Sequence, residues 1–350
     1  MTLTELGRLL GGVVKGGSDY EIRGVRDIER LSADQPLEEH FLYFVESKAV
    51  FKRHPLAATS GAALAPTALA EGFGRALAVE GDARLVFIRL LSLFDKAPKF
   101  QAGVSPQALV DPAARIDAGA VVMAGAVVMA GAVVGERCTL YPGATLEPHA
   151  EIGADTVVYP NTVIGHHCTV GKRGILHGGT VIGADGFGFY DDKGGRHKVP
   201  QIGSVAIGDD VEIGAGCTID RATIETTSIG DFTKIDDQVH IGHNCRLGRY
   251  MYIAGNTGLA GSVTAEDGVM ISGMVSVRDH LRLAKGSIVM GMSGLAQDTE
   301  AGQAYFGTPA RPARESHKMN SALAKLPGLL AKLRHLADAA DAPAGGSVPA

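Results

Sequence analysis

The chain has 350 residues, enough for two domains that each bury a core of their own. Charged residues make up 20% of the chain and the formal net charge is -5, which excludes a general nucleic-acid-binding protein, since such proteins carry a strongly basic surface. The 47 glycines and the absence of tryptophan favour a turn-rich repeat over a helical protein.

Residues 1–103 show no repeat and predict a compact α+β domain. Thr2 and Glu5 have the spacing of a capping box, which predicts that a helix starts there rather than a secretory signal peptide. Hydrophobic patterning predicts two strands and an amphipathic helix, over 41–45, 61–65 and 83–94. A short linker is predicted at 102–106.

A six-residue repeat of aliphatic residues runs from Val110 to Leu295, with interruptions at 186–201 and 220–228. A helix would place its apolar residues near every 3.6 positions, so this period excludes one. Three six-residue sides per coil would stack the aliphatic residues into a continuous interior. The repeat therefore predicts a parallel β-helix over residues 106–310.

The segment 118–134 offers an alternative, because its 17 uncharged residues reach the lower limit of a membrane-spanning helix. The sequence VVMAGA recurs there every six residues, in phase with charged parts of the repeat further along. A spanning helix has no reason to follow that period. The segment is predicted to form β-helix sides, and no transmembrane segment is expected.

The four cysteines test this interpretation. Each lies four residues after an aliphatic residue that opens a repeat: Cys138, Cys168, Cys217 and Cys245. One recurring slot for a small apolar side chain explains all four, whereas disulfides or a metal cluster would show paired spacing. They are predicted to be reduced and buried, in a reducing compartment.

The last part of the chain, 311–342, predicts a basic helical extension. Leucine and alanine recur at helical spacing, interrupted by Pro327, and lysine and arginine outnumber the acids. One or two amphipathic helices are expected. They would serve either as a solvated cap on a trimer or as a docking surface for an acidic partner.

His243 is the strongest candidate for chemistry. It lies two residues after Ile241, which opens a repeat, and Gly261 occupies the same slot one coil later. An imidazole beside an unhindered backbone N–H would combine a general base with an oxyanion donor. His280 follows His243 by two coils and one residue. The competing interpretation is a plain surface histidine.

A second interpretation treats His240, His243 and His280 as zinc ligands, because zinc accepts three histidines and a water. Their spacing matches no known zinc motif, and residues 240 and 243 should point from different parts of a coil. No metal is therefore expected.

Five longer motifs closely resemble the UDP-3-O-acylglucosamine N-acyltransferase family of lipid A biosynthesis: VIGADGFGFY (181–190), KVPQIG (198–203), IGAGCTIDRATI (213–224), IDDQVHIGHN (235–244) and GTPARPARE (307–315). The resemblance covers the N-terminal domain, the repeat and the tail. It implies a left-handed β-helix and a homotrimer, cytoplasmic or peripheral at the inner membrane. It also implies transfer of a 3-hydroxyacyl chain from the phosphopantetheine of acyl carrier protein to the 2-amine of UDP-3-O-(3-hydroxyacyl)glucosamine, without another cofactor. The product would be UDP-2,3-diacylglucosamine.

The resemblance also implies site residues. His243 matches the catalytic base, His280 the second active-site histidine and Gly261 the oxyanion donor. Asp236 and Asn244 would orient the base or the pantetheine arm, and His240 stands where relatives carry glutamine. The uridine motif, Phe-Leu-x-Asn-Pro-Lys-Tyr, is altered in this chain. The substrate-binding residues expected there are Phe44, Ser47 in place of asparagine, and Phe51, one place beyond the tyrosine position.

Three other functions remain open at this point. One is an O-acyltransferase that acts on UDP-N-acetylglucosamine, which would lack this N-terminal domain. Another is an acetyl-CoA-dependent sugar acetyltransferase. The last is a non-enzymatic or zinc-binding β-helix trimer.

Overall fold

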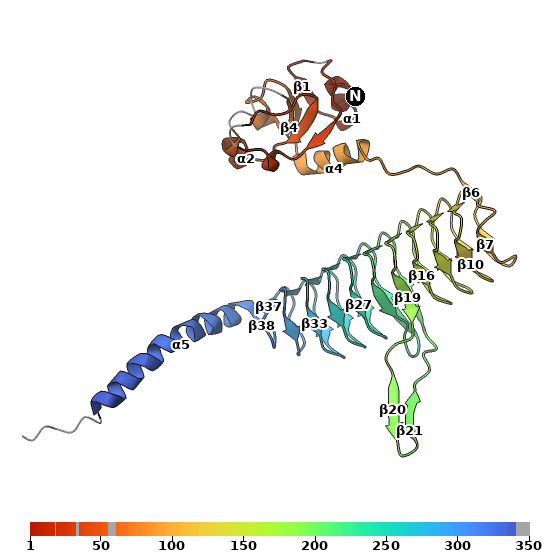
Figure 1. The fold of residues 1–350 in the computed structure, drawn as a ribbon, viewed down its shortest axis with the longest axis vertical. Helices are drawn as coiled ribbons and strands as arrows, with labels where there is room; N and C mark the ends of the chain where they lie inside the picture. Colours follow the sequence, from red (N-terminus) through yellow and green to blue (C-terminus); the bar gives the residue numbers. More distant parts are fainter. Residues whose placement is uncertain (18, 33–34, 55–60, 341–350) are drawn as a thin grey trace, which may run out of the picture. The chain divides into compact units, whose positions relative to one another are not determined.

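In the computed structural model, which describes residues 1–17, 19–32, 35–54 and 61–340, the chain forms two compact units (Figure 1). The first is Met1–Lys99 and the second is Phe100–Ala350.

The first unit is an α+β domain built on a sheet with the strand order β1-β5-β4-β3-β2. Strand β1 runs antiparallel to β5, and the other neighbours are parallel. Both predicted strands and the predicted helix are confirmed, as is the Thr2–Glu5 capping box. In chain order the elements are α1 (Leu3–Leu10), β1 (Val13–Lys15), β2 (Gly24–Arg26), η1 (Ile28–Arg30), β3 (Phe41–Phe44), α2 (Lys48–Arg53), β4 (Ala62–Pro66), α3 (Thr67–Ala70), β5 (Ala76–Val79) and α4 (Ala83–Leu93).

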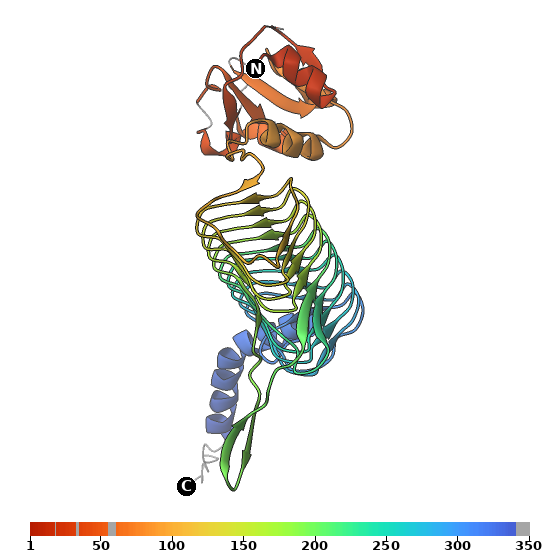
Figure 2. The ribbon, with the colours of Figure 1, turned by 90° about the vertical axis from the view of Figure 1, so that its right-hand side faces the viewer.

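This sheet separates two apolar clusters. Successive residues of a strand point to opposite faces, so Leu42 packs with the leucines of α1 while Tyr43 packs on the other side with Phe73. Figure 2 shows the helices around this sheet.

The second unit is a solenoid of short strands on three faces. Face 1 contains β7 (Leu109–Val110), β10 (Val127–Val128), β13 (Thr145–Leu146), β16 (Val163–Ile164), β19 (Val181–Ala184), β24 (Thr218–Asp220), β27 (His240–Ile241), β30 (Gly258–Leu259), β33 (Ser276–Val277) and β36 (Gly294–Leu295). Face 2 contains β8 (Arg115–Ile116), β11 (Val133–Val134), β14 (Glu151–Ile152), β17 (Thr169–Val170), β22 (Ser204–Ile207), β25 (Thr226–Ile229), β28 (Arg246–Leu247), β31 (Thr264–Ala265) and β34 (Arg282–Leu283). Face 3 contains β6 (Gly103–Val104), β9 (Val121–Val122), β12 (Thr139–Leu140), β15 (Val157–Val158), β18 (Ile175–Leu176), β23 (Glu212–Ile213), β26 (Lys234–Ile235), β29 (Tyr252–Ile253), β32 (Met270–Ile271), β35 (Ile288–Val289), β37 (Ala304–Phe306) and β38 (Arg311–Pro312).

The register confirms the predicted coil, because Val128 pairs with Leu146 and Ile241 with Leu259, in parallel. The repeat-opening residues point inward into one continuous core. The predicted β-helix is therefore confirmed. The segment 118–134 forms β9, β10 and β11, so the membrane-helix alternative is wrong. The first strand of the solenoid, β6, lies within residues 102–106, which were predicted to form a linker.

The cysteines are free and buried, as predicted. Burial raises the pKa of all four thiols, and that of Cys245 rises to about 12. They serve as packing residues of the core.

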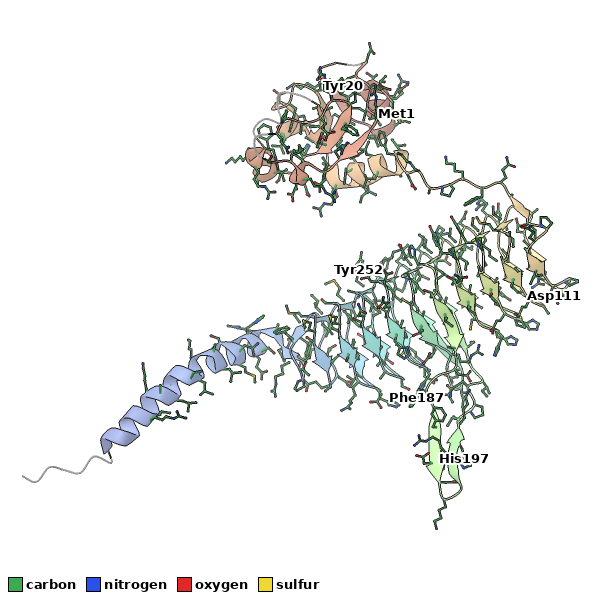
Figure 3. All side chains as sticks on the ribbon, in the orientation of Figure 1. Met1, Tyr20, Asp111, Phe187, His197 and Tyr252 are labelled. Carbon is green, nitrogen blue, oxygen red and sulfur yellow. The ribbon has the colours of Figure 1, made fainter. Side chains whose placement is uncertain are left out.

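The first interruption of the repeat is a β-hairpin rather than an irregular loop. Strands β20 (Phe189–Asp192) and β21 (Gly195–Lys198) pair antiparallel. The hairpin projects from the solenoid between β19 and β22, and Figure 3 labels Phe187 near its base and His197 on β21.

The tail forms one helix, α5 (Ala313–Ala340), with Pro327 inside it. It packs against β37 and β38 at its first turns and then extends away from the coils (Figure 1). Residues 341–342 of the predicted extension lie outside the described residues. Among the described residues, no helix is long and apolar enough to cross a membrane.

Candidate active site

His243 lies at the corner between β27 and β28, with glycines on both sides of its side chain. A β-carbon built on Gly261 would lie 2.7 Å from both Cε1 and Nε2 of His243. A β-carbon on Gly186, at the start of the hairpin insertion, would lie 2.6 Å from the β-carbon of His243. Neither glycine has a left-handed φ, so the space taken by the histidine explains the missing side chains.

Asn244 fixes the orientation of the imidazole. Its side-chain oxygen accepts a hydrogen bond from the backbone N–H of Thr223 at 3.0 Å, and its amide nitrogen donates to the carbonyl of Ile224 at 3.0 Å. The same oxygen lies 3.1 Å from Nδ1 of His243. Because this oxygen can only accept, Nδ1 carries the proton and Nε2 is left with a free lone pair. His243 is thereby prepared to accept a proton at Nε2.

Gly261 contributes its backbone on the Nε2 side of the ring. Its carbonyl accepts a hydrogen bond from the N–H of His280, but its own N–H donates to no acceptor within the described ranges. A free N–H next to a proton-accepting nitrogen is the pairing that acyl transfer requires, because the reaction releases a proton and develops an oxyanion.

His280 lies on the same edge of the solenoid but not against His243. It occupies the left-handed corner position that Asn244 and Ser262 hold in the two preceding coils. Its side chain is 75% exposed, and its Nε2 lies 4.0 Å from the carboxylate of Asp279. The expected spacing of two coils and one residue is thus what the structure has.

His240 is held by neighbours in β24. Its Nδ1 lies 2.8 Å from the hydroxyl oxygen of Thr218, and its Nε2 lies 3.8 Å from a carboxylate oxygen of Asp220. Asp220 is only 7% exposed. Burial raises the pKa of its carboxyl group, while the nearby His240 and His243 act in the opposite direction.

Sequence reasoning missed Asp220 as a site residue. It stands one place after the aliphatic Ile219, in the slot where Gly165, Gly183 and Gly242 follow theirs. The same slot holds Glu147 and Arg278 in other coils of this face, so a carboxylate there gave no signal in the sequence.

Arg221 was also missed. It is fully buried and anchors both ends of the hairpin insertion, because its Nε donates to the carbonyl of Gly183 and its Nη1 to that of Gly203, at 2.8 and 3.1 Å. Nη1 also lies 3.1 Å from Nδ1 of His166, whose pKa is lowered by burial and by the Arg221 charge. These bonds fix the base from which Gly186 reaches His243.

Asp236 lies on another part of the coil, directly after β26 on face 3. Its carboxylate accepts a hydrogen bond from the N–H of Gly255 at 2.9 Å. It lines a groove of about 430 Å³ together with Lys234, Tyr252 and Met270. Tyr252 is labelled in Figure 3. Within one chain, Asp236 and His243 therefore face different sides of the solenoid.

The first unit has its own cavity, of about 730 Å³, with Phe44 in its wall. Phe44 stacks on Phe87 at 4.4 Å between ring centres. The hydroxyl of Ser47 caps α2 by accepting from the N–H of Val50, and Phe51 packs edge-on against Phe73. Of the three predicted uridine residues, only Phe44 lines the cavity.

The zinc interpretation finds no support in the geometry. Across the described ranges, no group of three or more histidine, cysteine or acidic side chains is arranged to hold a metal ion.

One protein family and several known proteins are similar to this chain. A family model described as the GMPPB C-terminal domain matches residues 198–287. The UDP-3-O-acylglucosamine N-acyltransferase of Methylorubrum extorquens (strain PA1) is 46% identical over 144 residues, so the match spans only 41% of each chain. The protein of the same name from Pseudomonas aeruginosa (strain LESB58) is 33% identical over 336 residues, 96% of this chain and 93% of its own.

Among solved structures, the UDP-N-acetylglucosamine acyltransferase of Arabidopsis matches with a TM-score of 0.50 and 25% identity. That match covers 60% of this chain and 73% of the Arabidopsis chain.

Proposed function

The chain belongs to the UDP-3-O-acylglucosamine N-acyltransferase family, and from this premise we propose that it transfers a 3-hydroxyacyl chain from acyl carrier protein to the 2-amine of UDP-3-O-(3-hydroxyacyl)glucosamine. The observation that carries the proposal is the imidazole of His243, held by Asn244 at Nδ1 and lying against Gly261. The product is UDP-2,3-diacylglucosamine, an intermediate of lipid A biosynthesis.

The proposed reaction needs one base and one oxyanion donor. The neutral amine attacks the carbonyl carbon of the thioester, and Nε2 of His243 takes the proton that the nitrogen loses. The N–H of Gly261 donates to the oxygen that becomes negative. When the tetrahedral intermediate collapses, the C–S bond breaks and the phosphopantetheine sulfur leaves, taking the proton back from His243. No residue is acylated, and His280 assists from the same edge of the solenoid, two coils further along.

We place the uracil in the cavity of the first unit. Phe44 supplies an aromatic face there, and Arg26 and Arg84 are positively charged groups in the same wall. Ser47 and Phe51 have other contacts, so the altered motif leaves Phe44 as the stacking residue of this site.

We further propose a cytoplasmic homotrimer, free or peripheral at the inner membrane. The flat faces of a solenoid form a closed site only when a second wall is supplied. A second copy can bring a groove such as that of Asp236 to the His243 corner. His240, which is hydrogen-bonded to Thr218 and lies near the carboxylate of Asp220, supports the same corner from within the chain.

The test is mass spectrometry of products after incubation with 3-hydroxyacyl carrier protein and UDP-3-O-(3-hydroxyacyl)glucosamine. The proposal predicts a product heavier by one acyl chain and stable to mild base at the new amide. Acylation of UDP-N-acetylglucosamine at oxygen, or transfer from acetyl-CoA alone, would instead identify one of the two other acyltransferase classes. Absence of any transfer would leave a binding protein.

A further inference from the structure

Gln201 is the last residue of the hairpin insertion, and only 7% of its surface is exposed. Both ends of its side-chain amide are paired. Its Nε2 donates to the carbonyl of Val199 at 3.0 Å, and its Oε1 accepts from the hydroxyl of Thr223 at 3.0 Å. Because a carbonyl can only accept, the first bond fixes which end of the amide is the nitrogen. The buried amide is therefore held in one orientation between the two interruptions of the repeat.

Thr223 connects this amide to the active site. Its hydroxyl donates to Gln201, and its carbonyl accepts from the N–H of Ile202 at 3.0 Å. Its own N–H donates to the side-chain oxygen of Asn244, the same oxygen that lies 3.1 Å from Nδ1 of His243. A series of hydrogen bonds therefore runs from Gln201 through Thr223 and Asn244 to the imidazole.

The hairpin also brings Gln201 and His243 against the same glycine. A β-carbon built on Gly186 would lie 2.9 Å from Oε1 of Gln201 and 2.9 Å from Cδ2 of His243. Gly188 is close as well, since a β-carbon there would lie 3.1 Å from Nε2 of Gln201. In such close packing, a displaced amide would shift the ring through the hairpin backbone as well as through the hydrogen bonds.

We propose that Gln201 is a positioning residue for acyl transfer, which keeps the imidazole of His243 in its proton-accepting orientation. The inference rests on the proposed function. Gln201 acts through Thr223 and Asn244 and takes no part in the proton transfer itself. All the hydrogen bonds that carry this effect lie within one chain, so the effect needs no second copy.

Two substitutions that break the same hydrogen bond test the proposal. Gln201→Leu keeps a side chain of similar size that neither donates nor accepts a hydrogen bond. It should lower kcat about ten-fold and change the KM for either substrate by less than about two-fold, because the base loses its orientation and not a substrate contact. Thr223→Val removes the other partner and should have a similar effect. The double variant should be no slower than the slower single variant.

Thr156→Val is the control for the loss of a buried hydroxyl elsewhere in the solenoid. Thr156 is fully buried, and its hydroxyl donates to the carbonyl of Gly171 at 2.9 Å. This variant should have a lower Tm and the kcat of wild type. A kcat for Gln201→Leu within two-fold of wild type would overturn the proposal, as would a double variant slowed by the product of the two single effects.

A second readout requires no acyl transfer, so failure of the proposed function would not imitate failure of this inference. Nitrogen-15 NMR of histidine-labelled protein distinguishes a protonated ring nitrogen from one with a free lone pair, and His243→Ala identifies the signals of His243. In the neutral ring, wild type and Thr156→Val should carry the proton on Nδ1, whereas Gln201→Leu should show both tautomers. Unchanged signals of His243 in Gln201→Leu would overturn the proposal, even in a protein that transfers no acyl chain.

Discussion

The imidazole of His243 lies directly against Gly261, one coil further along the solenoid, where a β-carbon would come within 2.7 Å of Nε2. The stacking of coils alone creates this relationship, since Ile241 pairs in register with Leu259 two residues before each of them. A rigid repeat thereby holds a base and a backbone donor together without a preformed cleft.

Gly261→Ala should lower kcat about 100-fold, because the new methyl group pushes the ring from its position and misplacing a reacting group by about 1 Å has an effect of that size. The matched control is Gly258→Ala, whose β-carbon meets nothing within 4 Å. Steady-state kinetics on both variants check this. Similar kcat values for the two would show that the contact with Gly261 is unimportant.

Asn244→Gly should lower kcat at least about ten-fold, because the ring loses the acceptor that keeps the proton on Nδ1. Glycine tolerates the φ of 61° at this corner, so little strain is introduced. Asn256→Gly, at a corner with a φ of 57°, is the control and should retain activity. If both variants turn over like wild type, the tautomer is set by something other than Asn244.

Asp220→Asn should make the protein more stable at neutral pH. Burial raises the pKa of Asp220 above its ordinary value of 3.8, so the folded chain binds more protons there than the unfolded chain. The free energy of unfolding therefore falls as the pH rises from the ordinary pKa through the raised pKa of Asp220. The uncharged asparagine side chain removes that loss. Charges on His240 and His243 oppose the shift, and Asp185 adds to it.

The measurement is the difference in Tm between Asp220→Asn and wild type. It should be positive by about 2–4 °C near neutral pH and shrink as the pH approaches about 4. The exposed Asp279→Asn is the control. A lower Tm for Asp220→Asn at neutral pH would mean that the carboxylate stabilises the fold through its histidine neighbours.

Reversing the charge of three exposed lysines of α5 should raise the apparent KM for acyl carrier protein several-fold and leave kcat with saturating donor unchanged. The reason is loss of attraction to an acidic partner, so the effect should diminish as salt screens the charges. The variant carries glutamate at Lys318, Lys325 and Lys332. The control carries glutamate at three exposed lysines of the first unit: Lys52, Lys96 and Lys99. An unchanged KM at low salt would restrict α5 to a structural role.

The sequence predicted the solenoid well because every inward residue of a coil must be small or aliphatic, which leaves a visible period. The relationship between His243 and Gly261 followed from that period, as both residues lie in the uninterrupted stretch after Ile229. The tautomer of His243 could not be predicted, because it depends on the contact of the Asn244 side chain with Thr223, which lies within the second interruption.

Residues in or beside the interruptions escaped prediction for the same reason. Asp220 and Arg221 lie where the period is lost, so nothing in the spacing placed them beside His240 or Gly203. In the first unit, motif position suggested Ser47 and Phe51 for uridine. Both side chains have structural contacts instead: Ser47 caps a helix and Phe51 packs against Phe73.

The most direct test of the whole account is turnover by His243→Ala, measured as formation of the diacylated UDP-glucosamine. The control is His149→Ala, which replaces an exposed histidine several coils before His243 and should leave turnover as in wild type. The account predicts that His243→Ala keeps the Tm and assembly of wild type but loses turnover by about 100-fold or more. A correctly folded His243→Ala protein that turns over within a few-fold of wild type would contradict it.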